Sequence, residues 1–173
     1  LYLHGFRMNE AVMRFQTRKL QRLLPECNHY IIHGTHLANG DPDDIIASRF
    51  QPPLYEHAQF EYLPDRINYY GIDQSIDNLS NIVIEKEIDG IIGFSQGTYI
   101  GSILTHKFPL KFFISVCGMK CTDEKYTFNK NIPSFHIVGK QDDEFYQRGI
   151  DFYKEYNNAI LYAHQDGHMF PTE

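Results

Sequence analysis

Positive charge is scarce in this sequence. The chain has 16 lysines and arginines against 22 aspartates and glutamates, so its formal net charge is −6 at pH 7. Proteins that bind nucleic acid neutralise phosphates with a clustered basic surface, which supplies much of their affinity. No basic cluster stands out beyond the scattered Arg14, Arg18, Lys19 and Arg22. We therefore expect no nucleic-acid partner.

Cysteines and long apolar runs are scarce as well. The three cysteines, Cys27, Cys117 and Cys121, are an odd number and predict reduced thiols rather than a disulfide framework, which favours a cytoplasmic location. No apolar run approaches about 18 residues, so we expect no membrane span. No basic-then-apolar leader opens the chain. The sequence begins at Leu1, inside an expected strand, and we allow for a domain that is trimmed at both ends.

Strand-like and helix-like segments alternate along the 173 residues. A strand, a helix and a strand in succession are typical of a parallel βαβ unit. We predict a single α/β domain over residues 1–173, a three-layer sandwich with a mainly parallel sheet of about six strands. Helices are predicted after Asn9 and Asp73, which are candidate caps, from the residues after Ser95, and over 144–156. The predicted strands are residues 1–4, 28–33, 88–94, 112–116, 134–138 and 159–163.

Residues 34–71 break this alternation. Proline interrupts the segment at Pro42, Pro52, Pro53 and Pro64, and aromatic residues are frequent between these positions. A long irregular segment in a compact domain is usually functional or disordered, and the aromatic residues argue against disorder. We interpret residues 34–71 as a cap or pocket wall, with a packed surface excursion as the alternative.

The sequence Gly93-Phe94-Ser95-Gln96-Gly97 has the G-x-S-x-G pattern of a nucleophile elbow. It lies where an apolar strand gives way to a predicted helix, which is the context that this motif requires. A serine in such a sharp turn takes a positive φ, and side chains two residues to either side would collide. Ser95 is the candidate nucleophile, with Gly93 and Gly97 as elbow glycines. The alternative is a helix N-terminal serine without chemistry.

Two further residues match the chain order of the catalytic groups in α/β-hydrolases, which is serine, then an acid, then histidine. Asp142 follows the predicted strand 134–138, and His168 follows the last predicted strand. The carboxyl ends of parallel strands share one edge of a sheet, so we expect these side chains to meet there. His168 would act as general base and acid, and Asp142 would hold its tautomer. The alternatives are Asp142 as a helix cap and His164 as the catalytic histidine.

An oxyanion that forms during acyl transfer needs hydrogen-bond donors. Two backbone N–H groups suit this position. One belongs to Gln96, next to the candidate nucleophile, and the other belongs to Phe6, in the loop after the first predicted strand. His4-Gly5 would shape that loop, and an ordinary strand-to-loop turn is the alternative.

Other constellations carry less weight. The pair His33-x-x-His36 lacks partners at the spacing of a metallohydrolase, and Cys117-x-x-x-Cys121 lacks a second ligand pair. No glycine-rich loop matches a dinucleotide or phosphate fingerprint. We therefore expect no metal and no cofactor, and we interpret Cys117 as a small core residue.

Four segments of the chain form a series that is more specific than the elbow motif alone. The segments are Leu3-His4-Gly5-Phe6-Arg7-x-Asn9, Gly90-Ile91-Ile92-Gly93-Phe94-Ser95-Gln96-Gly97, Pro133-Ser134-Phe135-His136-Ile137-Val138-Gly139-x-x-Asp142, and Gly167-His168-x-x-Pro171. Together they resemble the FSH family of serine hydrolases within the α/β-hydrolase superfamily. The resemblance covers nearly the whole chain in the correct order and implies a compact esterase with a triad of Ser95, Asp142 and His168, no cofactor, and acyl esters as substrates.

The chain departs from the family pattern in two places. The middle segment has no tryptophan, and five residues follow His168 where members usually carry a helix.

Three functional hypotheses follow. The first is a serine hydrolase that cleaves carboxylic (acyl) esters through an acyl-enzyme intermediate, with a small-molecule acyl ester as its partner. The second is an enzyme similar to the acyl-protein thioesterases, which share Gly-Phe-Ser-Gln-Gly. The third is a catalytically silent scaffold or binding subunit, because a fold does not guarantee activity. The oligomeric state is left open.

Overall fold

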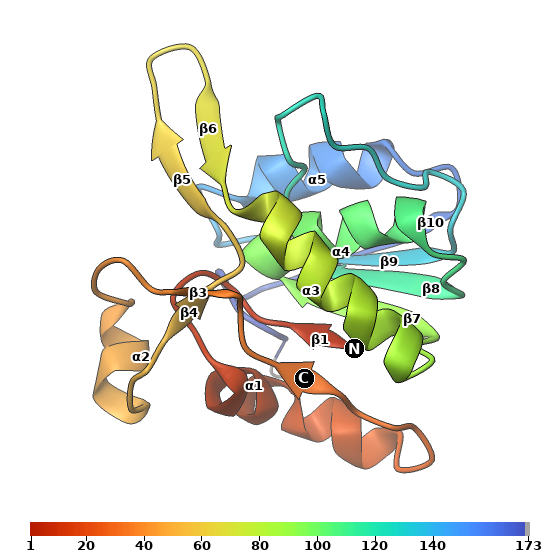
Figure 1. The fold of residues 1–173 in the computed structure, drawn as a ribbon, viewed down its shortest axis with the longest axis horizontal. Coiled ribbons are helices and arrows are strands. Elements are labelled where there is room, and N and C mark those ends of the chain that lie inside the picture. The colour runs from red at the N-terminus through yellow and green to blue at the C-terminus, as the bar shows by residue number, and fades with distance from the viewer. Residues whose placement is uncertain (172–173) are drawn as a thin grey trace.

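A six-stranded parallel sheet forms the centre of the structure, which is a computed structural model that describes residues 1–171. The last two residues of the predicted domain, 172 and 173, lie outside the described residues. Figure 1 shows the sheet between helices on its two faces, so the predicted three-layer α/β architecture and the strand number are confirmed. Neighbouring strands pair in parallel in the order β10-β9-β8-β7-β1-β2. The strands are β1 (Tyr2–Leu3), β2 (Ile31–Ile32), β7 (Gly90–Phe94), β8 (Phe112–Val116), β9 (Ser134–Gly139) and β10 (Ala159–His164).

Helix α1 (Glu10–Leu23) covers one face of this sheet, and α3 (Ile72–Glu85), α4 (Gln96–Lys107) and α5 (Tyr146–Lys154) cover the other. Successive strand residues point to opposite faces. Tyr2 therefore packs in one apolar cluster with Met13 of α1, and Leu3 packs in a second cluster with residues of α3, α4 and α5. None of the helices in residues 1–171 is both long enough and apolar enough to cross a membrane.

The α1 face is less well covered over the outer strands. Ile160 and Tyr162 of β10 are 66% and 44% exposed, and Phe112 at the start of β8 is 38% exposed. Parallel sheets are usually buried on both faces. This part of the sheet is therefore an exposed apolar surface among the described residues.

The two predicted helix caps have different outcomes. Asn9 is the N-cap of α1, and its side chain accepts a hydrogen bond from the Val12 N–H at 3.2 Å, as predicted. Asp73 is not a cap, and that prediction was wrong. Strand β6 (Ile67–Tyr70) precedes the helix, and Gly71 makes the turn with a φ of 79°, so α3 begins at Ile72. Asp73 lies in the first turn, where its carboxylate binds the side chains of Lys125 and Tyr126.

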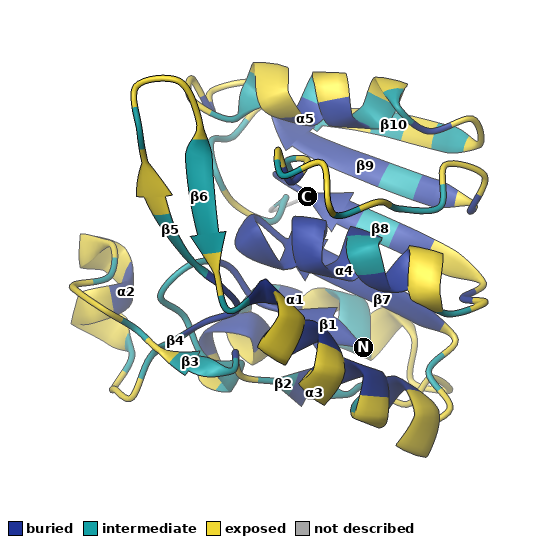
Figure 2. Ribbon diagram, turned by 45° about the horizontal axis from the view of Figure 1, so that its top comes forward, coloured by how far each residue is buried: buried dark blue, intermediate teal, exposed yellow. Residues whose placement is uncertain are grey.

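The segment 34–71 contains regular elements that the sequence pattern does not reveal. Strands β3 (His36–Leu37) and β4 (Tyr55–Glu56) pair antiparallel, and α2 (Asp44–Arg49) lies between them in the chain. Strands β5 (Gln59–Tyr62) and β6 (Ile67–Tyr70) form a hairpin. Figures 1 and 2 show these elements gathered at one end of the sheet, with the hairpin standing clear of it. It is the end at which β7 leads into α4.

Candidate active site

Ser95 occupies the turn between β7 and α4. Its φ is 51°, in the left-handed region that a serine rarely adopts. The Ser95 N–H donates to the Val116 carbonyl at 2.9 Å, which ties the turn to β8. A strained serine between a buried strand and a helix is typical of a nucleophile elbow.

The glycines on either side of Ser95 lie where no side chain fits. A Cβ atom on Gly93 would lie 2.6 Å from the Gly97 carbonyl oxygen, and a Cβ atom on Gly97 would overlap the Leu3 carbonyl oxygen of β1. The first turn of α4 is thus in direct contact with β7 and β1. The motif glycines are a packing requirement of this close approach.

Asp142 and His168 are joined by a hydrogen bond. His168 Nδ1 lies 2.6 Å from Asp142 Oδ2, and Asp142 is only 6% exposed. The other carboxylate oxygen, Oδ1, accepts from the Phe145 N–H at 3.2 Å, just before α5. Asp142 therefore binds both the turn before α5, whose N-cap residue is Phe145, and the imidazole of His168.

His164, the competing histidine, lies beside a different acid. It is the last residue of β10 and is 4% exposed. Its Nδ1 accepts from the Asp166 N–H at 3.2 Å and lies 3.6 Å from Asp166 Oδ2. The Asp142 carboxylate thus contacts His168 and not His164.

Two aromatic residues near Ser95 pack against the His168 ring. The ring of Phe94 lies 5.2 Å from the His168 ring, and the ring of Phe145, which lines the same cavity as Ser95, lies 4.6 Å from it. Within residues 1–171, no hydrogen bond joins Ser95 Oγ to His168. Such bonds are often long without substrate and tighten when substrate binds. The structure therefore joins Asp142 to His168 and leaves Ser95 near them but not bonded.

A small apolar cavity of about 90 Å³ opens beside Ser95. Its walls come from the loop after β1, the β5–β6 hairpin, the start of α4 and the loops after β8 and β9. Most of the lining side chains are aromatic, and none carries a formal charge. The lining residues are Phe6, Phe60, Tyr62, Ile67, Tyr69, Ser95, Gln96, Tyr99, Met119 and Phe145.

A larger groove of about 360 Å³ lies between the start of α1 and β4. Ser95, Asp142 and His168 are not among its lining residues, so we place the candidate site at the smaller cavity. The groove is lined by Asn9, Glu10, Ala11, Arg14, His33, Pro53 and Tyr55.

Two backbone N–H groups at the cavity are without protein acceptors. Phe6 and Gln96 both line it, and within residues 1–171 neither backbone N–H donates a hydrogen bond to the protein. Gln96 is the first residue of α4, where N–H groups have no partner within the helix. Both groups are therefore available to an oxygen atom in the cavity.

Cys117 lies beside the Asp142–His168 pair. Its Sγ and ligand atoms of those two residues lie within 4.8 Å of one another, which is a possible donor set for a metal ion. The carboxylate and the imidazole already bind each other, however, and burial raises the pKa of the Cys117 thiol to about 12. Because metals bind the thiolate, this protonated thiol fits a packing role better than a ligand role.

A comparison with known protein families identifies the family of this chain. The family described as serine hydrolase (FSH1) matches residues 1–173. The chain belongs to this family. The resemblance found in the sequence is thereby confirmed.

Similar proteins of this family occur in yeast and in a frog. The Family of serine hydrolases 3 protein of Saccharomyces cerevisiae is 33% identical over 99% of this chain and 77% of its own length. Esterase OVCA2 of Xenopus tropicalis is 26% identical over 99% of this chain and 85% of its own length. The match thus spans most of each relative.

Solved structures similar to this FSH1 serine hydrolase have the same fold. Esterase PE8 has a TM-score of 0.72 at 16% identity, and the match covers 99% of this chain and 84% of that chain. The Bacillus cereus carboxylesterase has a TM-score of 0.65 at 17% identity, with 99% and 80% covered. At these identities the similarity concerns the fold alone.

Some residues of this FSH1 serine hydrolase site were not anticipated from the sequence. The Gln96 side chain binds the backbone of residues 57–58, and the buried Glu56 forms an ion pair with the partly exposed Arg7. Alternation gave no signal for β4, which has only two residues. The one local signal that Glu56 has a special role is its position as an acidic residue in an aromatic segment, shortly after Pro52 and Pro53.

Proposed function

We propose that this serine hydrolase cleaves carboxylic esters through an acyl-enzyme intermediate on Ser95, with Asp142 and His168 completing a catalytic triad. The observation that carries the proposal is the 2.6 Å contact between His168 Nδ1 and Asp142 Oδ2 at the edge of the sheet where Ser95 follows β7. A carboxylate on Nδ1 keeps the proton there and leaves Nε2 free as the base.

In the first half-reaction, His168 Nε2 accepts the Ser95 hydroxyl proton while Oγ attacks the ester carbonyl carbon. The same imidazole then donates this proton to the alcohol leaving group. In the second half-reaction, His168 activates water in the same manner, and hydrolysis of the acyl-enzyme releases the carboxylic acid and regenerates Ser95. Asp142 stabilises the imidazolium cation in both steps.

The backbone N–H groups of Phe6 and Gln96 form the proposed oxyanion hole. Both line the Ser95 cavity and lack protein acceptors within residues 1–171, which supports this role. Donors that are fixed before negative charge develops stabilise the transition state more than the substrate.

Residues 34–71 are the proposed wall of the acyl pocket. Phe60, Tyr62, Ile67 and Tyr69 of the β5–β6 hairpin line the cavity, which supports an uncharged apolar acyl group there. Replacing Phe60 or Tyr62 by alanine should change the ratio of kcat/KM values between short and long acyl esters. Tyr70→Ala is the matched control, because Tyr70 is 51% exposed and does not line the cavity. Equal ratios in all three variants would contradict the assignment.

Labelling with a fluorophosphonate probe tests the nucleophile. We expect the wild-type protein to be labelled and to hydrolyse p-nitrophenyl esters, and Ser95→Ala to do neither. Ser48→Ala is the control, because Ser48 is exposed on α2. Labelling that persists in Ser95→Ala would place the nucleophile elsewhere, and absence of hydrolysis in the wild type over a range of oxygen and thiol esters would favour a silent scaffold. Comparison of matched oxygen and thiol esters distinguishes an esterase from a thioesterase.

We also propose a cytoplasmic location. The three cysteines are free thiols in the described structure, which supports a reducing compartment. Fractionation of cells that express the tagged full-length protein tests this, and recovery with secreted or luminal proteins would contradict it.

A further inference from the structure

Glu56 is a buried carboxylate in the segment that leads to the pocket hairpin. It is 1% exposed, and its Oε1 accepts from Arg7 Nε at 3.0 Å and from the Asn39 N–H at 3.3 Å. Burying a carboxylate is unfavourable unless it is paired and hydrogen-bonded. Arg7 directly follows Phe6, so this ion pair restrains the loop that carries one of the two proposed oxyanion donors.

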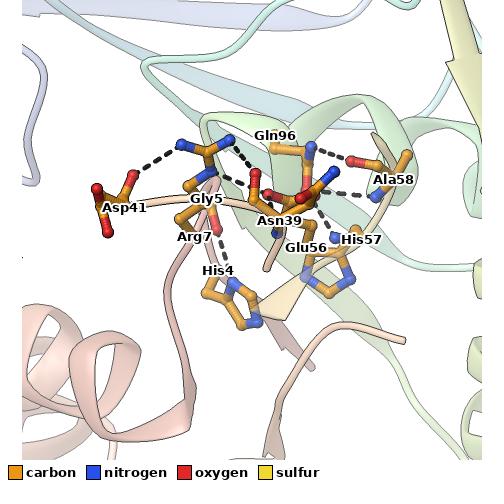
Figure 3. Close-up of polar contacts among 9 residues, drawn as sticks. All are labelled: His4, Gly5, Arg7, Asn39, Asp41, Glu56, His57, Ala58 and Gln96. Atoms are coloured by element: carbon orange, nitrogen blue, oxygen red, sulfur yellow. Dashed lines mark hydrogen bonds and ion pairs between the residues drawn. The ribbon is translucent and has the colours of Figure 1, made fainter. Parts of the chain in front are cut away.

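Arg7 makes further contacts that hold the same loop. Nη1 donates to the Asp41 carbonyl at 2.8 Å, and Nη2 donates to the Asn39 carbonyl at 2.6 Å (Figure 3). Met8 and Tyr55 exchange two backbone hydrogen bonds, of 3.2 and 2.7 Å. The φ of Arg7 is 52°, which a residue with a side chain seldom adopts. The loop is thus held in a strained shape by its contacts with β4 and residues 39–41.

The Gln96 side chain binds the two residues that follow Glu56. Its Oε1 accepts from the His57 N–H at 2.6 Å, and its Nε2 donates to the Ala58 carbonyl at 2.7 Å. Figure 3 shows this amide facing the backbone of Ala58. The side chain is buried within the protein, as Gln96 is 2% exposed. The residue that carries the second proposed donor is therefore tied to residues 57–58.

His4 fixes the direction of the first donor. Its Nε2 accepts from the Gly34 N–H at 2.7 Å, so its proton lies on Nδ1, which donates to the Gly5 carbonyl at 2.7 Å. Burial lowers the pKa of His4 to about 4 and keeps the ring neutral. The Gly5 carbonyl and the Phe6 N–H belong to one planar trans peptide, in which the two groups point in opposite directions. Holding the carbonyl therefore orients the Phe6 N–H.

We propose that Glu56, acting through Arg7, and the Gln96 side chain are positioning residues that set the separation of the two oxyanion-hole donors. The inference rests on the proposed function of Ser95. Glu56, His57 and Ala58 are consecutive, so the Phe6 loop and the start of α4 are both attached to one short stretch of backbone. Preorganised donors are effective only when their positions are fixed before charge develops. The segment that forms the pocket wall would thereby also control the rate of the chemical step.

Glu56→Gln tests this inference, because it keeps the size of the side chain and an acceptor for Arg7 but removes the charge. A misplacement of about 1 Å can cost about 100-fold in rate, so we expect kcat to fall about 10- to 100-fold. KM should change by less than about threefold, and the Ki of a trifluoromethyl ketone should rise by the factor by which kcat/KM falls. A purely structural role would lower the unfolding midpoint without changing kcat per folded molecule. Unchanged kcat and Ki in the folded variant would overturn the inference.

Gln96→Ala is the second variant, and it keeps the backbone N–H of residue 96. We expect the same pattern of kcat, KM and Ki, and this variant decides the question if Glu56→Gln does not fold. Glu10→Gln is the matched control, because it removes the same charge from an exposed pair in which Arg14 Nη2 lies 2.6 Å from Glu10 Oε1. Its kcat should equal that of the wild type.

Ser95→Ala, assayed in parallel, separates the two proposals. If Ser95→Ala keeps its activity, the proposed function fails, and the positioning inference fails with it. If Ser95→Ala is inactive while Glu56→Gln and Gln96→Ala keep wild-type kcat and Ki, the positioning inference alone fails.

Discussion

The imidazole of His168 and the carboxylate of Asp142 meet at 2.6 Å, although the two residues are 26 positions apart in the chain. The carboxylate is fixed from its other side by the Phe145 N–H at 3.2 Å. Asp142 is therefore oriented by the turn before α5 and needs no movement to hold the histidine. A carboxylate restrained in this way selects one tautomer of the imidazole.

Replacing Asp142 by asparagine should lower kcat by about 10³- to 10⁴-fold. An asparagine oxygen can still accept from the Phe145 N–H, so the turn is preserved, but its amide group favours the wrong histidine tautomer. Steady-state kinetics on a p-nitrophenyl ester provides the measurement. Asp143→Asn is the control, because Asp143 is exposed and should keep wild-type kcat. Wild-type kcat in Asp142→Asn would remove Asp142 from the triad.

Gly97→Ala should destabilise the fold. The added methyl group would overlap the Leu3 carbonyl oxygen of β1, which is backbone and cannot rotate away. We expect the free energy of unfolding to fall by about 3 kcal/mol or more, the range of strongly disruptive substitutions. Urea unfolding followed by circular dichroism measures this change. Gly167→Ala is the control, because its nearest neighbour would lie 3.6 Å away. Similar midpoints for the two variants would contradict the packing argument.

Acidification should destabilise the protein through His136. This ring is 1% exposed, and burial lowers its pKa to about 4 from 6.5. Between pH 6.5 and 4 the unfolded chain binds a proton that the folded protein does not, so stability falls as pH decreases through this window. The shift corresponds to roughly 3 kcal/mol at most.

Urea midpoints at pH 7 and pH 4 measure this effect. His136 packs against Phe152 and Tyr156. His136→Phe keeps an aromatic ring at this position but removes the group that binds a proton, so we expect a smaller loss of stability on acidification than in the wild type. The exposed His106, replaced by glutamine, serves as the control. Equal losses in the wild type and His136→Phe would show that His136 does not contribute.

The three cysteines should react at very different rates with iodoacetamide at pH 8. Burial raises the pKa of Cys117 to about 12 and that of Cys121 to about 11, so little thiolate is present at either position. Cys27 is exposed and should account for the single fast equivalent, which mass spectrometry can locate. Cys27→Ser should abolish fast labelling, and activity should be unaffected by it. Fast alkylation of Cys117 would contradict its described burial.

The long periodic elements and the order of the candidate catalytic groups could be predicted from the sequence. Strands β8, β9 and β10 lie within one residue of their predicted bounds, because each is a run of five or six residues rich in aliphatic and aromatic side chains. Asp142 and His168 were predicted from the chain order and from their positions after β9 and β10, and the topology brings the ends of these strands to one edge, where the two side chains are in contact. The pairing of these two residues and the position of Ser95 then follow from the parallel sheet.

The segment 34–71 could not be predicted in the same way. Its strands have two to four residues, which is too short for alternation to be visible. The contact of Arg7 with Glu56 joins residues 49 positions apart, and no local pattern signals it. The Asp73 cap was wrong for a related reason, because the hairpin strand β6 sets where α3 begins.

The attachment of residues 56–58 to Arg7 and Gln96 limits how this enzyme can be re-engineered for new substrates. On the positioning proposal made above, we expect that exchange of the whole region between β2 and α3 with that of another hydrolase would change selectivity and catalytic rate together. A transplant restricted to residues 59–70 leaves β4 and the two residues after it in their native sequence. The hairpin is therefore the segment to exchange, and strand β4 should keep its native sequence.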